Sequence, residues 1–396
     1  MRTFRTMLAA ALLLALAAAL LPGDAQAIPA FARTHKLSCT TCHAPFPRLK
    51  EFGNEFAANG FTIPEQEKDR DFISAGDDLL KLNRTFPLAV RFDAFAVYES
   101  DAAIDNDLQI PYGLKLLSGG NVASNVGYYF YFYMNERGEV AGIEDAYIHF
   151  NNVGGRPFDI MVGQFQTSDP LMKRELRLTY EDYLAYKTKI GDSRTTLTYD
   201  RGLMMTYDIE STGTGLVGMV VNGNGKPEAG DDHRFDDDGY KNYGLRLTQA
   251  LGEFLSVGYF GYTGREETAP IGSDPTFTNK LSWHGPDLTL GNGMFDLTAQ
   301  YLIRRDTNPT FVADAVEVET TGIVAELVFA PRRDRSRKYF TLLYNRVDSD
   351  WDAYDYETWT VSGTHLLARN LRGTVEYTRD VEHETDRVAV GIVTAY

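Results

Sequence analysis

Cysteine is almost absent from this chain of 396 residues, which holds only Cys39 and Cys42. A disulfide between residues so close in sequence would close a very small loop and stabilise little. Basic residues are also scarce, because 39 Lys and Arg stand against 55 Asp and Glu, giving a formal net charge of −16. Proteins that bind nucleic acid carry the opposite charge, so the composition argues against a nucleic-acid partner.

Long apolar runs are missing beyond the N-terminus, so no membrane-spanning helix is expected. The one apolar run, Met7–Leu21, follows two arginines and precedes the small-residue pattern Ala25-Gln26-Ala27. This is the layout of a cleaved secretory signal peptide, and the run is too short for a membrane anchor. We therefore expect residues 1–27 to direct export and to be removed.

Aromatic residues are abundant, with 23 Tyr and 23 Phe. From Phe86 onward, apolar residues alternate with polar, small or Tyr residues, as in 295–303 and in 126–133, where Tyr129, Tyr131 and Tyr133 share one face. Turn-like clusters such as Asn222-Gly223-Asn224-Gly225 separate these segments. The pattern predicts an all-β fold, an outer-membrane β-barrel of about 16 antiparallel strands over residues 83–396.

The last alternating segment, residues 388–396, has to pair with the first strand, because closure is what removes the edges of such a sheet. A secreted β-sandwich or propeller is the soluble alternative. No repeat of propeller length is present in the sequence, and the aromatic content favours the membrane barrel.

Residues 28–82 have a short and mixed pattern with several prolines. Leu49, Phe52 and Phe56 recur at helical spacing, which predicts one short helix after the two cysteines. A region this small has little core of its own, so it needs a cofactor or a host surface to be ordered.

The cysteines belong to the motif Cys39-Thr40-Thr41-Cys42-His43. This spacing suits two thioether bonds from one helical turn to the vinyl groups of a haem, with His43 as the proximal iron ligand. A zinc site would want further Cys or His ligands at matched spacing, and a thioredoxin-like pair would want a βαβ context. We therefore expect one covalent haem c held by Cys39, Cys42 and His43.

The sequence does not decide which residue is the second axial ligand of the haem iron. No Met lies between residues 28 and 82, so His35 is the candidate nearest the motif. An equally supported interpretation is that His35 is a solvated polar residue with no role as a ligand. If the haem sits inside the barrel, donors further along the chain become available: His149, His233, His284, His365, His383, Met134 and Met161.

Acidic residues cluster most densely at Asp231–Asp238. Their oxygens would suit a hard divalent cation such as Fe²⁺, although a solvated loop is the usual meaning of such a run. Asp101, Asp105 and Asp107 are interpreted in the same way.

The segments Ile28–Arg33, Cys39–His43 and Pro47–Gly53 resemble the start of fused outer-membrane monohaem cytochrome–porins, best known from iron-oxidising bacteria. The segments Gly163–Pro170 and Arg174–Thr179 are more similar to monohaem porins of metal-reducing bacteria. The resemblance implies a monohaem cytochrome plug at residues 28–82 inside a porin-like barrel at residues 83–396.

The implied function is electron transfer across the bacterial outer membrane, between extracellular iron or another metal and a periplasmic c-type cytochrome or other redox carrier. Oxidation of Fe²⁺ would then be the reaction, although the resemblance leaves the direction of electron flow open. Two alternatives remain: a solute porin with a structural or sensory haem, and a peroxidase with an open sixth position on the iron and a distal acid–base residue.

Overall fold

The computed structural model describes residues 30–63, 72–74, 76–77, 81–83, 87–168, 171–236, 238–267 and 276–396. Several sequence predictions lie outside these residues: the signal peptide at 1–27, Ile28 and Pro29 of the family resemblance, Asp169 and Pro170 of its second segment, and Asp237 of the acidic run.

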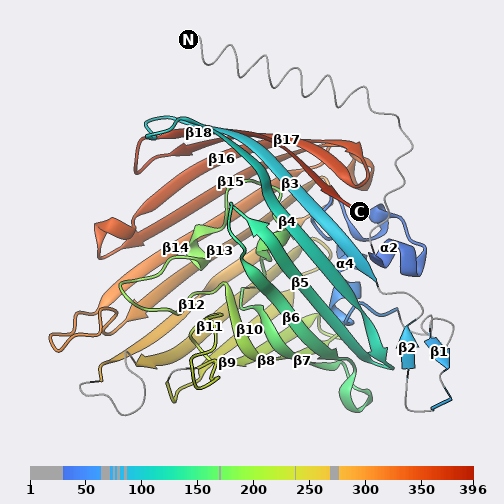
Figure 1. Ribbon diagram of the computed structural model, residues 1–396, viewed down its shortest axis with the longest axis horizontal. Helices are drawn as coiled ribbons and strands as arrows, with labels where there is room; N and C mark the ends of the chain where they lie inside the picture. Colours follow the sequence, from blue (N-terminus) through green and yellow to red (C-terminus); the bar gives the residue numbers. More distant parts are fainter. Residues whose placement is uncertain are drawn as a thin grey trace, which may run out of the picture.

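In the described part of the chain, sixteen antiparallel strands close into one barrel, in which each strand pairs with its neighbours in sequence (Figure 1). The prediction of an all-β barrel of about 16 strands is confirmed. The strands are β3 (Leu88–Glu99), β4 (Asn106–Ala123), β5 (Val126–Glu136), β6 (Gly142–Phe150), β7 (Phe158–Gln166), β8 (Tyr199–Ile209), β9 (Thr214–Val221), β10 (Asn242–Ala250), β11 (Leu255–Glu267), β12 (Thr278–Gly291), β13 (Phe295–Asp306), β14 (Val318–Phe329), β15 (Lys338–Ser349), β16 (Tyr356–Ala368), β17 (Leu371–Asp380) and β18 (Asp386–Ala395).

The barrel closes between its last and first strands. Strand β18 pairs with β3, placing Val390 opposite Ala96. Beyond the end of β18, Val90 and Tyr396 exchange backbone hydrogen bonds of 2.6 and 2.8 Å. The predicted pairing of the final segment is confirmed, and it leaves no unpaired edge in the barrel.

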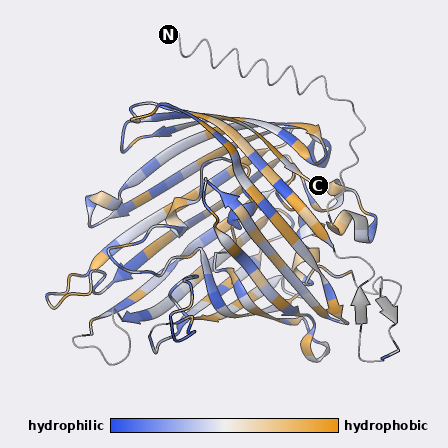
Figure 2. Cartoon of the chain, in the orientation of Figure 1, coloured by the Kyte–Doolittle hydropathy of each residue, from blue (hydrophilic) through white to orange (hydrophobic). Residues whose placement is uncertain are grey.

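The period-two pattern separates a lumen face from an outer face. Tyr129, Tyr131 and Tyr133 are buried inside, as their alternation suggested. The outer face carries exposed apolar side chains such as Leu245 and Val375, and Figure 2 shows hydrophobic residues distributed along the strands. A lumen face with fully buried side chains means that the barrel interior is filled.

The two ends of the barrel differ in the length of their connections. At one end, which we call the short-turn end, strands are joined by turns such as 124–125, 292–294 and 369–370. At the other, the long-loop end, connections include 167–198 and 222–241. In outer-membrane barrels the short turns face the periplasm and the longer loops face outward.

The N-terminal residues 30–63, here called the plug, contain helices α2 (Ala30–His35), α3 (Cys39–Cys42) and α4 (Glu51–Ala58). Helix α4 confirms the helix predicted from sequence. Figure 1 shows α2 and α4 beside the C-terminus of the chain. No helix among the described residues is long and apolar enough to cross a membrane.

Two short strands follow the plug, β1 (Phe72–Ser74) and β2 (Lys81–Asn83), and they form a small antiparallel sheet of their own. The first barrel strand begins at Leu88. Asn83, the predicted first residue of the barrel region, belongs to β2 of this small sheet.

Candidate functional site

Residues Cys39–His43, here called the CxxCH turn, form one helical turn that is capped at both ends. The Thr40 N–H donates to Ser38 Oγ at 3.4 Å, and the His43 N–H donates to the Cys39 carbonyl at 2.9 Å. Both cysteines are free, partly exposed thiols, and burial raises the pKa of each. The motif spacing thus brings two thiols onto a single turn.

The backbone of His43 leaves this turn in an extended conformation (φ −121°, ψ 141°). The imidazole Nδ1 lies 2.8 Å from the Pro47 carbonyl. Because a carbonyl only accepts, Nδ1 carries the proton and Nε2 keeps its lone pair. Burial lowers the pKa of His43, so the ring is held neutral with one nitrogen available as a ligand.

Helix α4 packs directly against the CxxCH turn. The Lys50 N–H donates to the Cys42 carbonyl at 2.9 Å. A Cβ placed on Gly53 would lie only 2.3 Å from the same oxygen. Gly53 is therefore the residue that allows α4 to approach the turn so closely.

A cavity of about 610 Å³ lies between the plug and the barrel wall. Cys39, Cys42 and His43 all line it. Its volume falls within the range of roughly 300–1,000 Å³ usual for pockets that bury a small ligand. The plug contributes mainly apolar and aromatic side chains to its walls: Phe31, Leu37, Phe46, Leu49, Phe56 and Phe61.

Aromatic stacking joins the plug to the lumen wall. The rings of Phe31 and Phe61 stack with centroids 4.8 Å apart, and Phe61 stacks on Tyr129 of β5 at 4.7 Å. Next along β5, Tyr131 shares a hydrogen bond with the Tyr199 hydroxyl inside the barrel. The lumen tyrosines therefore serve to pack the plug and the interior together.

Basic side chains from the barrel and its connections also line the cavity. Arg91 of β3 is paired with Asp93, with Nη2 and Oδ2 2.9 Å apart. Lys173 lies 3.2 Å from Glu175. Lys115 of β4 is buried, with its Nζ 4.1 Å from the centroid of a tyrosine ring. The site thus combines an apolar wall with three basic side chains, two of which are paired with carboxylates.

Polar contacts anchor the plug at the short-turn end. Arg48 Nη1 lies 3.0 Å from Asp296 Oδ2 at the start of β13. The side-chain amide of Asn151, after β6, donates to the Asn59 carbonyl at the end of α4. These contacts place the CxxCH turn at the end of the barrel that faces the periplasm in barrels of this type.

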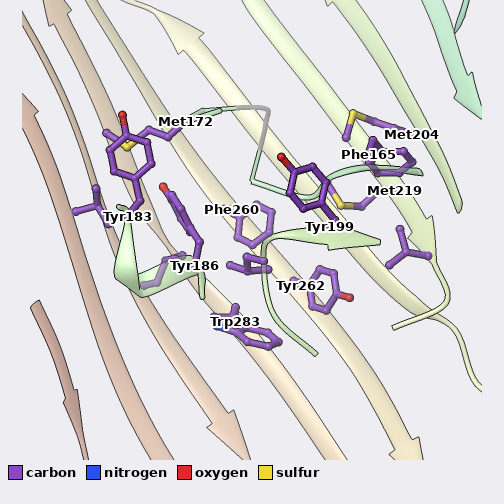
Figure 3. Packing of buried hydrophobic residues seen from close by; sticks show 14 of the residues in the cluster. Phe165, Met172, Tyr183, Tyr186, Tyr199, Met204, Met219, Phe260, Tyr262 and Trp283 are labelled. Atoms are coloured by element: carbon purple, nitrogen blue, oxygen red, sulfur yellow. The ribbon is translucent and has the colours of Figure 1, made fainter. Parts of the chain in front are cut away.

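The connection between β7 and β8, residues 167–198, folds into the barrel, and we call it the lumen-crossing segment. It includes the short 3₁₀ helices Arg174–Leu176 and Leu184–Tyr186. Figure 3 shows its residues Met172, Tyr183 and Tyr186 packed among buried barrel residues. Its polar contacts reach several strands: Glu175 O with Arg91 of β3, Ser193 with Glu266 of β11, Tyr186 with Gln300 of β13, Tyr183 with Glu326 of β14, and the Tyr180 and Glu181 N–H groups with Glu376 of β17.

A buried ion cluster stiffens this segment. Asp182 accepts from Arg174 through both oxygens, at 3.0 and 2.5 Å, and lies 3.1 Å from Lys187 Nζ. Burial opposes ionisation of Asp182, but Arg177, Arg174 and Lys187 outweigh it and hold the pKa of the carboxyl well below its ordinary value. Asp182 is therefore ionised and paired across the physiological range.

A second cavity of about 610 Å³ has mainly polar walls. Residues of the lumen-crossing segment, of the β3–β4 and β5–β6 hairpins and of the starts of β16 and β18 line it, among them Gln109, Arg137, Glu181, Asp182, Lys187 and Arg387. Such a chamber is suited to water and small polar solutes.

The structure separates the seven proposed barrel donors into two groups. His149 and Met161 line the cavity of the CxxCH turn, and so does His35 from the plug. The remaining donors do not line that cavity: His233 and His383 in loops, His284 and His365 on barrel strands, and Met134 near the end of β5.

Sequence reasoning did not single out Arg91, Lys115 or Lys173. The signal was present for Lys115, which stands between Leu114 and Leu116 in what the structure shows to be strand β4. If the two leucines face outward, the lysine has to face the lumen. No such pattern marks Lys173, which lies in the lumen-crossing segment.

The acidic run at 231–238 lies in the β9–β10 connection, where Asp231 and Asp232 are exposed. Asp232 pairs with the exposed Arg234 at 3.2 Å, and Asp236 pairs with Lys241. The described members of the run thus have the character of a solvated, internally paired loop. Within the described residues, no three His, Cys, Asp or Glu side chains come together as metal ligands.

No protein-family model matches this chain, and no curated protein matches it in sequence. Solved structures do match in fold. An anion-selective porin from Comamonas acidovorans is 11% identical with a TM-score of 0.56, and 79% of this chain covers 99% of the porin. A loop-deletion mutant of OmpT, an outer membrane protein of Vibrio cholerae, is 12% identical with a TM-score of 0.55 and the same coverage.

The outer membrane channel DcaP of Acinetobacter baumannii is 15% identical with a TM-score of 0.54, and 78% of this chain covers 96% of that channel. Identities this low establish the fold alone. The barrel is therefore porin-like, and its chemistry has to be argued from its own residues.

Proposed function

We propose that this protein is an outer-membrane barrel that holds one covalent haem c at its periplasmic end and transfers single electrons across the membrane. The exchange would join an extracellular metal couple such as Fe²⁺/Fe³⁺ to a periplasmic c-type cytochrome or other carrier. The observation that carries the proposal is that Cys39, Cys42 and His43 together line one largely apolar cavity between the plug and the barrel wall.

The residues of that cavity fit the group. Cys39 and Cys42 would hold it through thioethers, and the neutral His43 would ligate its iron through Nε2. Arg91, Lys115 and Lys173 would offer basic partners for its two carboxylates. When bound, haem c supplies reversible one-electron exchange at its iron.

The lumen-crossing segment supports electron transfer in preference to free solute flow. It is bonded to strands around the barrel and places Tyr183 and Tyr186 in the interior, both buried. Hydrocarbon blocks electrons, so the chain has to hold a redox group inside a protein wall. The plug and this segment together provide such a filled interior.

The test begins with the full chain matured in a host competent for thioether attachment. Intact mass and the visible spectrum should show one bound porphyrin. Stopped-flow mixing with Fe²⁺, and with Fe³⁺ chelates after reduction, then measures electron exchange in each direction. Cys39→Ala/Cys42→Ala is the matched control, because it keeps the barrel and removes both tethers. A folded barrel without porphyrin would overturn the proposal.

The second candidate is a solute porin in which any haem is structural or sensory. The similarity in fold to solved porins favours it, and so does the polar chamber lined by Arg137, Lys187 and Arg387. Liposomes carrying the protein should then swell in sugar solutions at a rate that the cysteine variant does not change. If the protein transfers electrons instead, liposomes should swell little with either the wild-type protein or the cysteine variant.

A further inference from the structure

His149 on β6 is buried without a complete set of partners. Its side chain is only 4% exposed, and it lines the cavity of the CxxCH turn. Nδ1 has no hydrogen-bond partner among the described residues. Nε2 has Asp159 Oδ2 at 4.0 Å, too far for a direct hydrogen bond. A buried imidazole nitrogen without a partner is costly unless a ligand completes it.

The plug lies directly against this histidine. A Cβ on Gly60 would be 3.4 Å from His149 Cβ, and Asn151, two residues along the same chain, donates to the Asn59 carbonyl. His149 therefore lies where the end of α4 meets the barrel wall, with its ring bordering the cavity that His43 borders from the plug.

Sulfur-containing side chains lie beside His149 on the lumen face of the barrel wall. In the strand register His149 is opposite Met161 of β7, and Met161 is opposite Met204 of β8. All three line the cavity. One side of the cavity therefore consists of an imidazole and two thioethers, side-chain types that ligate haem iron or other soft metal centres.

We propose that His149 is the second axial ligand to the iron, so that the barrel wall and the plug each contribute one imidazole. The inference rests on the proposed haem site and assigns the ligand that the sequence left open. The carboxylate nearest the other nitrogen, Asp159 Oδ2 at 4.0 Å from Nε2, makes no direct hydrogen bond to the ring. A ligand from β6 would also fasten the plug to the barrel.

Two other side chains that line the cavity could serve as the second axial ligand in place of His149. His35 ends α2 and packs its ring edge-on against Phe56, with centroids 5.2 Å apart. Met161 is the cross-strand neighbour of His149. His149 lies within the nine-residue strand β6, whereas His35 is the last residue of the six-residue helix α2. The burial of its unpartnered nitrogen distinguishes His149 from Met161.

The test compares His149→Leu, His149→Met, His35→Leu and Met161→Leu in the haem-loaded full chain. His365→Leu is the matched control, because His365 is an exposed strand histidine. Intact mass reports covalent haem, circular dichroism reports the barrel, and the visible spectrum and reduction potential report ligation. Wild-type protein should be low-spin with two nitrogen ligands.

His149→Leu should convert the iron to a high-spin state that added imidazole restores. His149→Met should remain low-spin with a higher potential, because a thioether ligand raises it. His35→Leu, Met161→Leu and His365→Leu should keep the wild-type spectrum. An unchanged spectrum in His149→Leu, or a high-spin spectrum in His35→Leu or Met161→Leu, would overturn the assignment. Wild-type protein without covalent haem would instead refute the proposed function itself.

Discussion

Replacing Gly53 by Ala tests the close contact between α4 and the CxxCH turn. Ala is favoured over Gly inside a helix by about 0.8–1.0 kcal/mol. Against this, the new Cβ would lie 2.3 Å from the Cys42 carbonyl, which already accepts from Lys50. Overpacking of this kind costs about 1–3 kcal/mol, occasionally more. Because the opposing atom belongs to the backbone, the cost should lie at the upper end, leaving a net loss of about 1–2 kcal/mol.

Hydrogen exchange of the α4 amides in detergent-solubilised protein measures this loss. A local destabilisation of 1–2 kcal/mol should speed exchange by about 5–30-fold. Gly373→Ala in β17 is the control, because a Cβ there meets nothing within 4 Å, and α4 exchange should not change. Slower exchange in Gly53→Ala would mean that helix propensity dominates, and it would refute the close approach.

Three further predictions concern charged groups. The partly buried ion pair of Arg48 and Asp296 should show a coupling of about 1 kcal/mol, the upper end of the range for exposed pairs, in a double-mutant cycle read by protease protection of the plug, and added salt should weaken it only slightly. Asp182→Asn leaves Arg174 and Lys187 without their buried counter-charge and should cost about 3–5 kcal/mol in denaturant unfolding, whereas Asp232→Asn at an exposed pair should change little. Because Arg177, Arg174 and Lys187 hold the pKa of Asp182 well below its ordinary value, its stabilisation is complete above about pH 3.9. It should be lost only as the pH falls through that lowered pKa, so the unfolding curves of wild type and Asp182→Asn should converge only in strong acid.

The barrel could be predicted because its signal is local. Residues 295–303 and 388–396 alternate with period two, and alternation alone decides which side chains face the lumen. The helix after Cys42 was predictable for the same reason, from the spacing of Phe52 and Phe56.

The site was only partly predictable, because it depends on contacts between distant parts of the chain. The motif names Cys39, Cys42 and His43, yet nothing in their spacing indicates that His149 borders the same cavity. The lumen-crossing segment was missed because it follows neither helical nor strand periodicity. Its fold depends on tertiary partners such as Glu376, which lies almost two hundred residues further along the chain.

Ala395, from the final barrel strand, lines the cavity of the CxxCH turn together with Ala89 from the first. The wall of this chamber is therefore complete only when the two extremities of the sheet have met. A group attached to Cys39 and Cys42 before that event would be taken in together with the plug, whereas a group arriving later would have to pass through the opening that remains. Attachment before the sheet closes is the order of assembly that this geometry favours.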